Sequence, residues 1–108
     1  MNPTLLQQLI DELFATLEKN DPSLAPLLAM LNGIIDEVGL PALAALLASL
    51  GISGTTSVVA FVDGLFQALE QKMVGHPFVL AALTFINEMI DAAVSKLTVT
   101  PKGFSSVK

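Results

Sequence analysis

The side chains that could carry out chemistry are few in this sequence, and His76 is its only histidine. A catalytic histidine needs a nucleophile or substrate beside it and usually a carboxylate that orients its ring. No serine lies in a nucleophile-elbow pattern, and His76 stands between Gly75 and Pro77, where a turn between helices is expected. The sequence therefore favours a turn residue over a catalytic one.

The carboxylates offer a second candidate, because Glu88 and Asp91 lie three residues apart on one expected helix face and could share a cation. A di-iron bundle would need Glu-x-x-His pairs from facing helices, and the sequence holds a single histidine. The adjacent acids at 11–12 and 36–37 diverge around a helix. A hydrolase with paired carboxylates stays open as an alternative, but the pattern favours solvated helix surfaces. No catalytic residue, metal ligand or cofactor is assigned.

A third candidate is the segment Gly51–Gly54, which precedes an expected helix and could hold an anion at the helix N-terminus. It lacks the glycine spacing and the lysine of a phosphate loop. The methionines at 30, 73 and 89 fall on apolar helix faces and are expected to fill the core.

Composition excludes several classes of function. The 108 residues include no cysteine, so disulfides, zinc–thiolate sites and thiol catalysis are ruled out. The five basic residues are all lysines, and the three near the C-terminus lie beside no aromatic stacking platform, so nucleic-acid binding is not expected. The hydrophobic fraction of 53% excludes disorder. The charged fraction is 14%, against about 25% in soluble domains.

Apolar residues recur at spacings of three and four along most of the chain, which predicts an all-α fold. We expect a compact bundle of about five helices, with N-caps at Thr4, at Ser23 and at Ser53 or Thr55. The β-branched start of the fourth helix would also suit a short strand. The expected helices are 4–19, 23–38, 41–50, 55–73 and 77–97.

Two similar junctions organise the chain, because a glycine and a proline stand close together at 39–41 and again at 75–77. Glycine favours the end of one helix and proline the start of the next. These junctions predict two helical hairpins, 23–50 and 55–97, with an internal duplication as an alternative. Gly33 interrupts the second helix, which indicates close approach of another helix.

The C-terminus differs from the rest of the chain in charge. Residues 1–95 carry ten acids and two lysines, a net charge of −8, whereas residues 96–108 carry three lysines and no acid. We expect a helical domain at 1–97 and an extended basic tail at 98–108 that docks on an acidic neighbour. A tail that is merely solvated is the alternative.

A membrane-spanning helix is disfavoured. The run from 38 to 62 has no charge and is long enough to cross a bilayer, but its centre is polar and no tryptophan or tyrosine flanks it. A hairpin that inserts on contact stays open. The N-terminus lacks the pattern of a secretory signal, so a cytoplasmic origin is expected, with a particle or complex as a final location.

The strongest positive signal is an excess of apolar surface, and residues 41–50 are apolar on all sides, which predicts a buried helix. We expect a non-enzymatic structural or assembly protein that self-associates or docks into a larger complex, such as a virion or similar particle. The alternatives are a membrane-active or lipid-binding protein and, less favoured, an enzyme. The predicted interaction residues are Leu43, Leu46, Leu47 and Leu50 of that helix and Lys102, Phe104 and Lys108 of the tail.

Overall fold

Helices account for all the regular secondary structure in the part of the chain that the computed structural model describes, residues 1–53 and 56–108. The all-α prediction with five helices is confirmed, and the fourth helix begins without the strand considered for it. The elements are α1 (Pro3–Asn20), a short 3-10 helix η1 (Pro22–Leu24), α2 (Ala25–Val38), α3 (Leu40–Ser49), α4 (Val58–Lys72) and α5 (Pro77–Ser95).

The helix starts follow local chemistry, although all three expected N-caps are wrong. The Asn2 side chain accepts the N–H of Leu5 at 2.7 Å, so Asn2 caps α1 in place of Thr4. The reason is Pro3, which fits the first helical position because it has no N–H to satisfy. At α4 the cap is Ser57, whose hydroxyl accepts the N–H of Ala60 at 3.2 Å.

Neither expected cap of α4 holds that position. Ser53 lies five residues before the start of α4, and Thr55 falls outside the described residues. Ser23 lies within η1, where the Asp21 carboxylate accepts its N–H at 3.1 Å. The helix boundaries thus shift by a few residues, while the number and order of the helices are as predicted.

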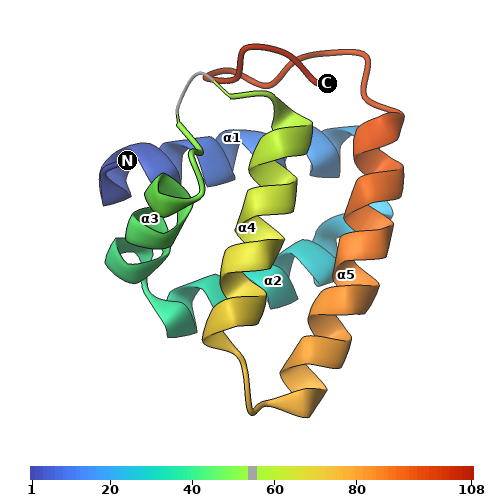
Figure 1. Cartoon of the computed structure of the whole chain (residues 1–108). Coiled ribbons are helices and arrows are strands. Elements are labelled where there is room, and N and C mark those ends of the chain that lie inside the picture. Colours follow the sequence, from blue (N-terminus) through green and yellow to red (C-terminus); the bar gives the residue numbers. More distant parts are fainter. Residues whose placement is uncertain (54–55) are drawn as a thin grey trace.

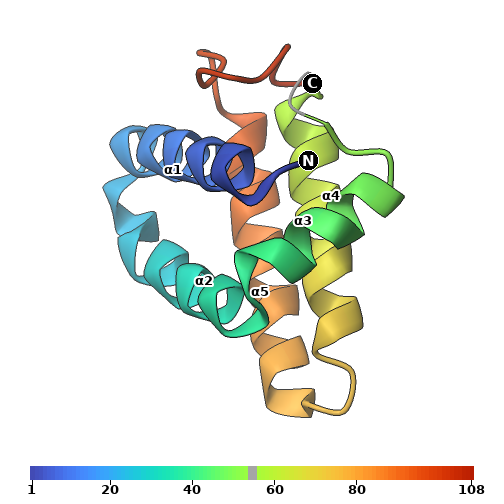
Figure 2. The ribbon, with the colours of Figure 1, turned by 90° about the vertical axis from the view of Figure 1, so that its left-hand side faces the viewer.

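The helices form two layers (Figure 1). In one layer α4 and α5 run antiparallel, side by side, and α1 and α2 cross them in the other, as the view turned by 90° shows (Figure 2). The short α3 packs on α1, α2 and α4. Helix α4 therefore contacts α2, α3 and α5, whereas α5 packs chiefly on α4 and α2.

The two glycine–proline junctions share a backbone conformation but not a geometry. Gly39 and Gly75 adopt φ values of 92° and 91°, a region that favours glycine. The single residue Gly39 joins α2 to α3, and the two helices meet at 91°. The longer connection 73–76 lets α5 fold back along α4 (Figure 1). The hairpin predicted at 55–97 is therefore present, and the one predicted at 23–50 is a corner.

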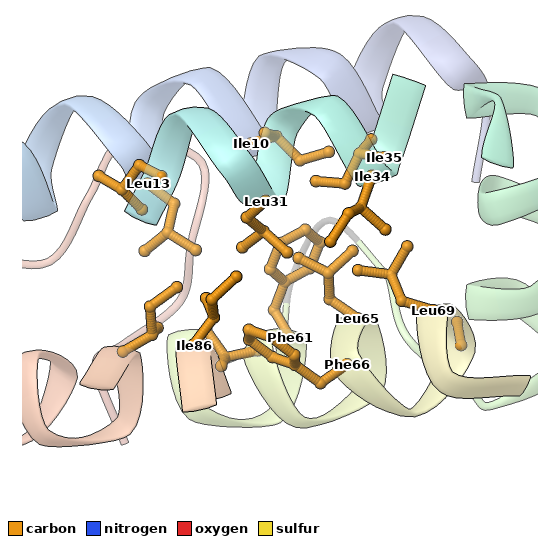
Figure 3. Packing of buried hydrophobic residues seen from close by; sticks show 14 of the residues in the cluster. Ile10, Leu13, Leu31, Ile34, Ile35, Phe61, Leu65, Phe66, Leu69 and Ile86 are labelled. Carbon is orange, nitrogen blue, oxygen red and sulfur yellow. The ribbon is translucent and has the colours of Figure 1, made fainter. Parts of the chain in front are cut away.

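One hydrophobic core lies between the layers (Figure 3). Phe61 and Phe66 of α4 are its largest fully buried side chains. Around them pack aliphatic side chains from α1, α2 and α5, such as Leu13, Leu31 and Ile86. The buried residues of the described chain are all nonpolar, so the core offers no polar chemistry.

Two expectations about packing are wrong. Helix α3 is buried on one face only, because its outer positions are mostly small: Ala45, Ala48 and Ser49 are exposed. Alanine makes a helix look uniformly apolar but contributes little surface that must be hidden. Gly33 of α2 is exposed, and a β-carbon built there would meet no atom within 4 Å. No other helix of this chain approaches at that glycine.

Candidate interaction surface

The C-terminal tail lies on the helical domain of its own chain. The carbonyls of Ser106 and Val107 accept the N–H groups of Val58 and Val59 at 2.9 and 3.0 Å, and Ser105 N–H donates to the Thr56 carbonyl at 3.2 Å. The first N–H groups of a helix have no partner within the helix. Two tail carbonyls therefore complete the capping of α4, whose next N–H is held by Ser57.

Side chains of the tail reinforce this contact. The rings of Phe104 and Phe61 meet edge to face with centroids 5.2 Å apart, a favourable arrangement for aromatic pairs. Gly103 has a φ of 95° and lies so near Leu9 that a β-carbon there would come within 2.9 Å of the leucine side chain. Pro101 is buried. The tail lacks a helix, as predicted, but it turns at Lys102–Gly103 instead of staying extended throughout.

These contacts place the predicted tail residues. Phe104 is half-buried against its own domain, and Lys102 and Lys108 are exposed. Docking of the tail on a neighbouring molecule stays a prediction, because the structure holds one chain.

The capping of α4 also bears on the expected anion site. The helix starts at Val58, beyond the segment 51–54, of which Gly54 lies outside the described residues. The N–H groups of Val58, Val59 and Ala60 each have a partner within the chain. An anion at this helix end would have to displace those partners.

The four leucines predicted as interaction residues line the inner side of α3. Leu43 and Leu47 are fully buried in the core of their own chain. Leu46 and Leu50 are half-buried and pack against that core. The structure thus packs all four leucines against the core of their own chain, whereas Lys102 and Lys108 are exposed.

The most exposed apolar side chains lie elsewhere, on α5. Phe78 is 90% exposed, Phe85 54% and Met89 40%. Their spacing of seven and four residues puts them on one side of the helix. Alanines at 81, 82 and 92 share that side by the same spacing. We call this surface the α5 outer face, defined as Phe78, Ala81, Ala82, Phe85, Met89 and Ala92.

Charged side chains are absent from the α5 outer face itself. Glu88 lies at its edge, and Asp91 is farther round the helix. At the end of the hairpin, Val74 is 74% exposed and extends the apolar surface beyond α5. The other large exposed hydrophobic residues of the described chain are isolated ones on other segments: Met30, Val59 and Val99. The face therefore holds three of the seven large exposed hydrophobic residues of the described chain.

The α5 outer face escaped the sequence analysis. Met89 was expected in the core, which is wrong because it is 40% exposed, and Phe78 and Phe85 were not singled out. The buried stripe instead consists of Leu83, Ile86, Ile90, Ala93 and Val94. A second stripe at 78, 85, 89 and 92 was the signal that could have revealed an uncovered side.

A shallow groove runs between α4 and α5, with a volume of about 580 Å³. Valines 59, 62 and 94 contribute apolar walls, and Asp63, Asp91 and Lys108 contribute charged groups. Partial burial raises the pKa of the Asp91 carboxyl above its ordinary value, and the neighbouring Asp63 carboxylate raises it further. Both aspartates are exposed, so the groove resembles an ordinary seam between two helices.

The chemical candidates remain apart. His76 is exposed in the turn between α4 and α5, and Glu88 is exposed on α5. Within residues 1–53 and 56–108, no three histidine, aspartate or glutamate side chains come together as a metal-binding group.

One helix in the described chain, α5, is long and apolar enough to cross a membrane, and 28% of its most apolar window is buried in the structure. The joined segments 22–38 and 40–49 are together also long and apolar enough to cross a membrane, but they meet at an angle of 91°. The uncharged run 38–62 includes the end of α2, all of α3 and the start of α4, so it is not a single helix. No protein-family model, curated protein or solved structure matches this chain.

Proposed function

We propose that this chain is a non-enzymatic assembly protein that associates with other protein through the α5 outer face. The observation that carries the proposal is the 90% exposure of Phe78 at the start of a continuous apolar stripe. Contiguous apolar patches on small proteins mark interaction sites, whereas scattered apolar residues need no explanation. Self-association or docking in a larger complex, a virion or similar particle among them, would cover this stripe.

Energetics support association through this face. Full burial of a large apolar side chain contributes roughly 1.5–3 kcal/mol, and both Phe78 and Phe85 are more than half exposed. The chain has a strong core without them, since Phe61, Phe66 and their neighbours are fully buried. The two exposed rings therefore add little to folding and can contribute to binding.

The proposal assigns different roles to the residues predicted from sequence. Leu43 and Leu47 hold α3 to the core, and Phe104 holds the tail to α4. A tail that clips onto a neighbour is a separate proposal, in which Lys102 and Lys108 would meet acidic groups of another molecule.

Light scattering after size exclusion tests the proposed function. We expect a concentration-dependent mass above the 11.3 kDa of one chain that the double variant Phe78→Gln/Phe85→Gln reduces to one chain. Met30→Gln is the matched control, because Met30 is 52% exposed on α2 and the change adds no charge. An oligomer that survives the double variant would overturn the proposal, and a monomer at every concentration up to about 1 mM would overturn self-association in favour of docking on a different protein.

A second candidate is membrane or lipid binding, and the hairpin end favours it. Val74 and Phe78 project there, on the helix that could cross a bilayer by length and composition. Five acidic charges in excess weigh against binding to anionic membranes. Flotation with liposomes at neutral and acidic pH separates the two candidates, because the assembly proposal expects no flotation at either pH. Association that resolves only in mild detergent would support the lipid candidate.

A further inference from the structure

We propose that the occupant of the α5 outer face is a second copy of the same face, packed antiparallel across a two-fold axis near Phe85. This inference rests on the proposed function and adds the partner and the pairing. In a two-fold interface each surface must complement itself, so residue i of one copy meets residue j of the other and the reverse. The order of large and small residues on α5 meets that requirement.

The size pattern fixes the register. If Phe85 lies opposite Phe85 of the second copy, positions whose numbers sum to 170 face each other. Phe78 then lies against Ala92, and Met89 lies against Ala81. Each large side chain at the ends meets an alanine, as interdigitating helices require. Moving the axis by one and a half residues would oppose Phe78 to Met89 and lose this match.

Charge is compatible with the same arrangement. The carboxylate of Glu88, at the edge of the face, lies level with Ala82, about 9 Å along the axis from Glu88 of the second copy, and so meets no like charge directly. Antiparallel helices place the positive N-terminal end of one dipole beside the negative C-terminal end of the other. Each chain carries a net charge of −5, so two copies repel at long range. Salt screens that repulsion and should strengthen the dimer several-fold.

The exposed area suits a weak dimer. An aromatic side chain buries about 150–250 Å², and the exposed fractions of Phe78, Phe85 and Met89 are 90%, 54% and 40%. With the alanines, each copy could bury about 400–500 Å², close to the roughly 1,000 Å² in total that specific interfaces reach. We therefore expect dissociation in the micromolar range or above, and a dimer visible only in concentrated solution.

Disulfide trapping tests the pairing cleanly, since the chain has no cysteine of its own. The variants Ala82→Cys and Glu88→Cys are mixed and oxidised, with a tag on one of them. The two cysteines lie at the same level along the two helices in the proposed register. Two copies of position 82 lie six residues apart along the helices, about 9 Å, and disulfides need α-carbons within about 7 Å. We expect cross-linked heterodimer in the mixture and at least tenfold less product from either variant alone.

Four outcomes decide the inference. Trapping in the mixture alone supports the antiparallel pairing. Trapping of Ala82→Cys with itself would indicate a parallel pair and overturn it, as would equal trapping with Asn32→Cys, a control cysteine on the exposed side of α2. An oligomer that depends on Phe78 and Phe85 but gives no trapped product would overturn the pairing and leave the proposed function standing. A circular-dichroism spectrum of each variant establishes that it folds.

Discussion

Helices α4 and α5 form one hairpin and are both rich in apolar residues, yet the fold treats them in opposite ways. Eight residues of α4 are buried, spread around the helix, because α2, α3, α5 and the C-terminal tail all lie against it. Helix α5 is four residues longer but buries five, on the side that faces α4 and α2. Its opposite side leaves Phe78, Phe85 and Met89 in solvent.

This difference shows that apolar residues stabilise a fold only where neighbours reach them. The phenylalanines of α4 are core because three helices surround them (Figure 3). Those of α5 stay in solvent because no other helix among the described residues covers that side (Figures 1 and 2). The same kind of substitution should therefore change stability by different amounts in the two helices.

The largest separation is expected between Phe61→Ala in α4 and Phe85→Ala in α5. Phe61 is fully buried, so its truncation leaves a cavity and should cost about 3–5 kcal/mol of unfolding free energy. Phe85 is more than half exposed, and its truncation in dilute, monomeric protein should cost about 1 kcal/mol or less. Urea unfolding measures both, and similar losses would contradict the comparison.

Removal of the tail should expose the start of α4 to solvent, as the α5 outer face is exposed. Deletion of 98–108 removes two capping hydrogen bonds, each about 1 kcal/mol, and the pairing of Phe104 with Phe61, about 0.5–1.5 kcal/mol beyond its area. We expect a loss of about 2–4 kcal/mol in urea unfolding. The control is Lys102→Gln/Lys108→Gln, which removes exposed charge and should stay within about 0.5 kcal/mol of the wild type. Equal stability of the deletion and the wild type would show that the tail contact is dispensable.

Two helical glycines extend the comparison from α4 to the exposed side of α2. An alanine β-carbon at Gly64 in α4 would come within 2.8 Å of the Ile52 side chain, whereas one at Gly33 would meet open space. Glycine costs a helix about 1 kcal/mol relative to alanine, so Gly33→Ala should raise stability by that amount. The stability of Gly64→Ala should be about 1–2 kcal/mol lower than that of Gly33→Ala, because the isoleucine side chain must shift. Thermal unfolding of the two variants measures this difference, and equal gains in stability would contradict it.

The smallest effect is expected at the seam between the two helices, where burial and Asp63 raise the pKa of Asp91. A folded-state pKa above the unfolded one means that the contribution of Asp91 to stability is full at low pH and is lost as pH rises through the folded-state pKa. We therefore expect Asp91→Asn to gain stability relative to the wild type as pH rises from about 3 toward neutral. At neutral pH the wild-type carboxyl is ionised in both the folded and the unfolded states. A constant difference between the two proteins over that range would contradict the shift.

The helices and their order were predictable because helix formation depends on spacing within about one turn. The stripe from Leu6 to Leu17 in α1 and the buried positions of α2 follow the predicted period. The wrong caps, Thr4 in place of Asn2, Ser23 in place of Asp21 and Ser53 or Thr55 in place of Ser57, arose because several polar residues stand before each helix. Only the backbone geometry selects among them.

The α5 outer face was not predictable in the same way. Between Pro77 and Ser95 nearly every position outside Thr84, Asn87, Glu88 and Asp91 is apolar, so the spacing alone allows two stripes and does not say which is covered. Similarly, the basic tail showed its charge in the sequence but not the carbonyl caps it provides to α4, since backbone groups are the same in every sequence.

By itself, then, the sequence determined an all-α chain with five helices, a nonhelical basic tail and no thiol chemistry, because these properties follow from composition and from contacts within a few residues. The tertiary structure alone decided that α2 and α3 meet as a corner, that the tail caps α4 and that Phe78 and Phe85 stay in solvent. Those outcomes depend on which distant segments reach a given face. That choice is made by packing the whole chain at once, and no local pattern records it.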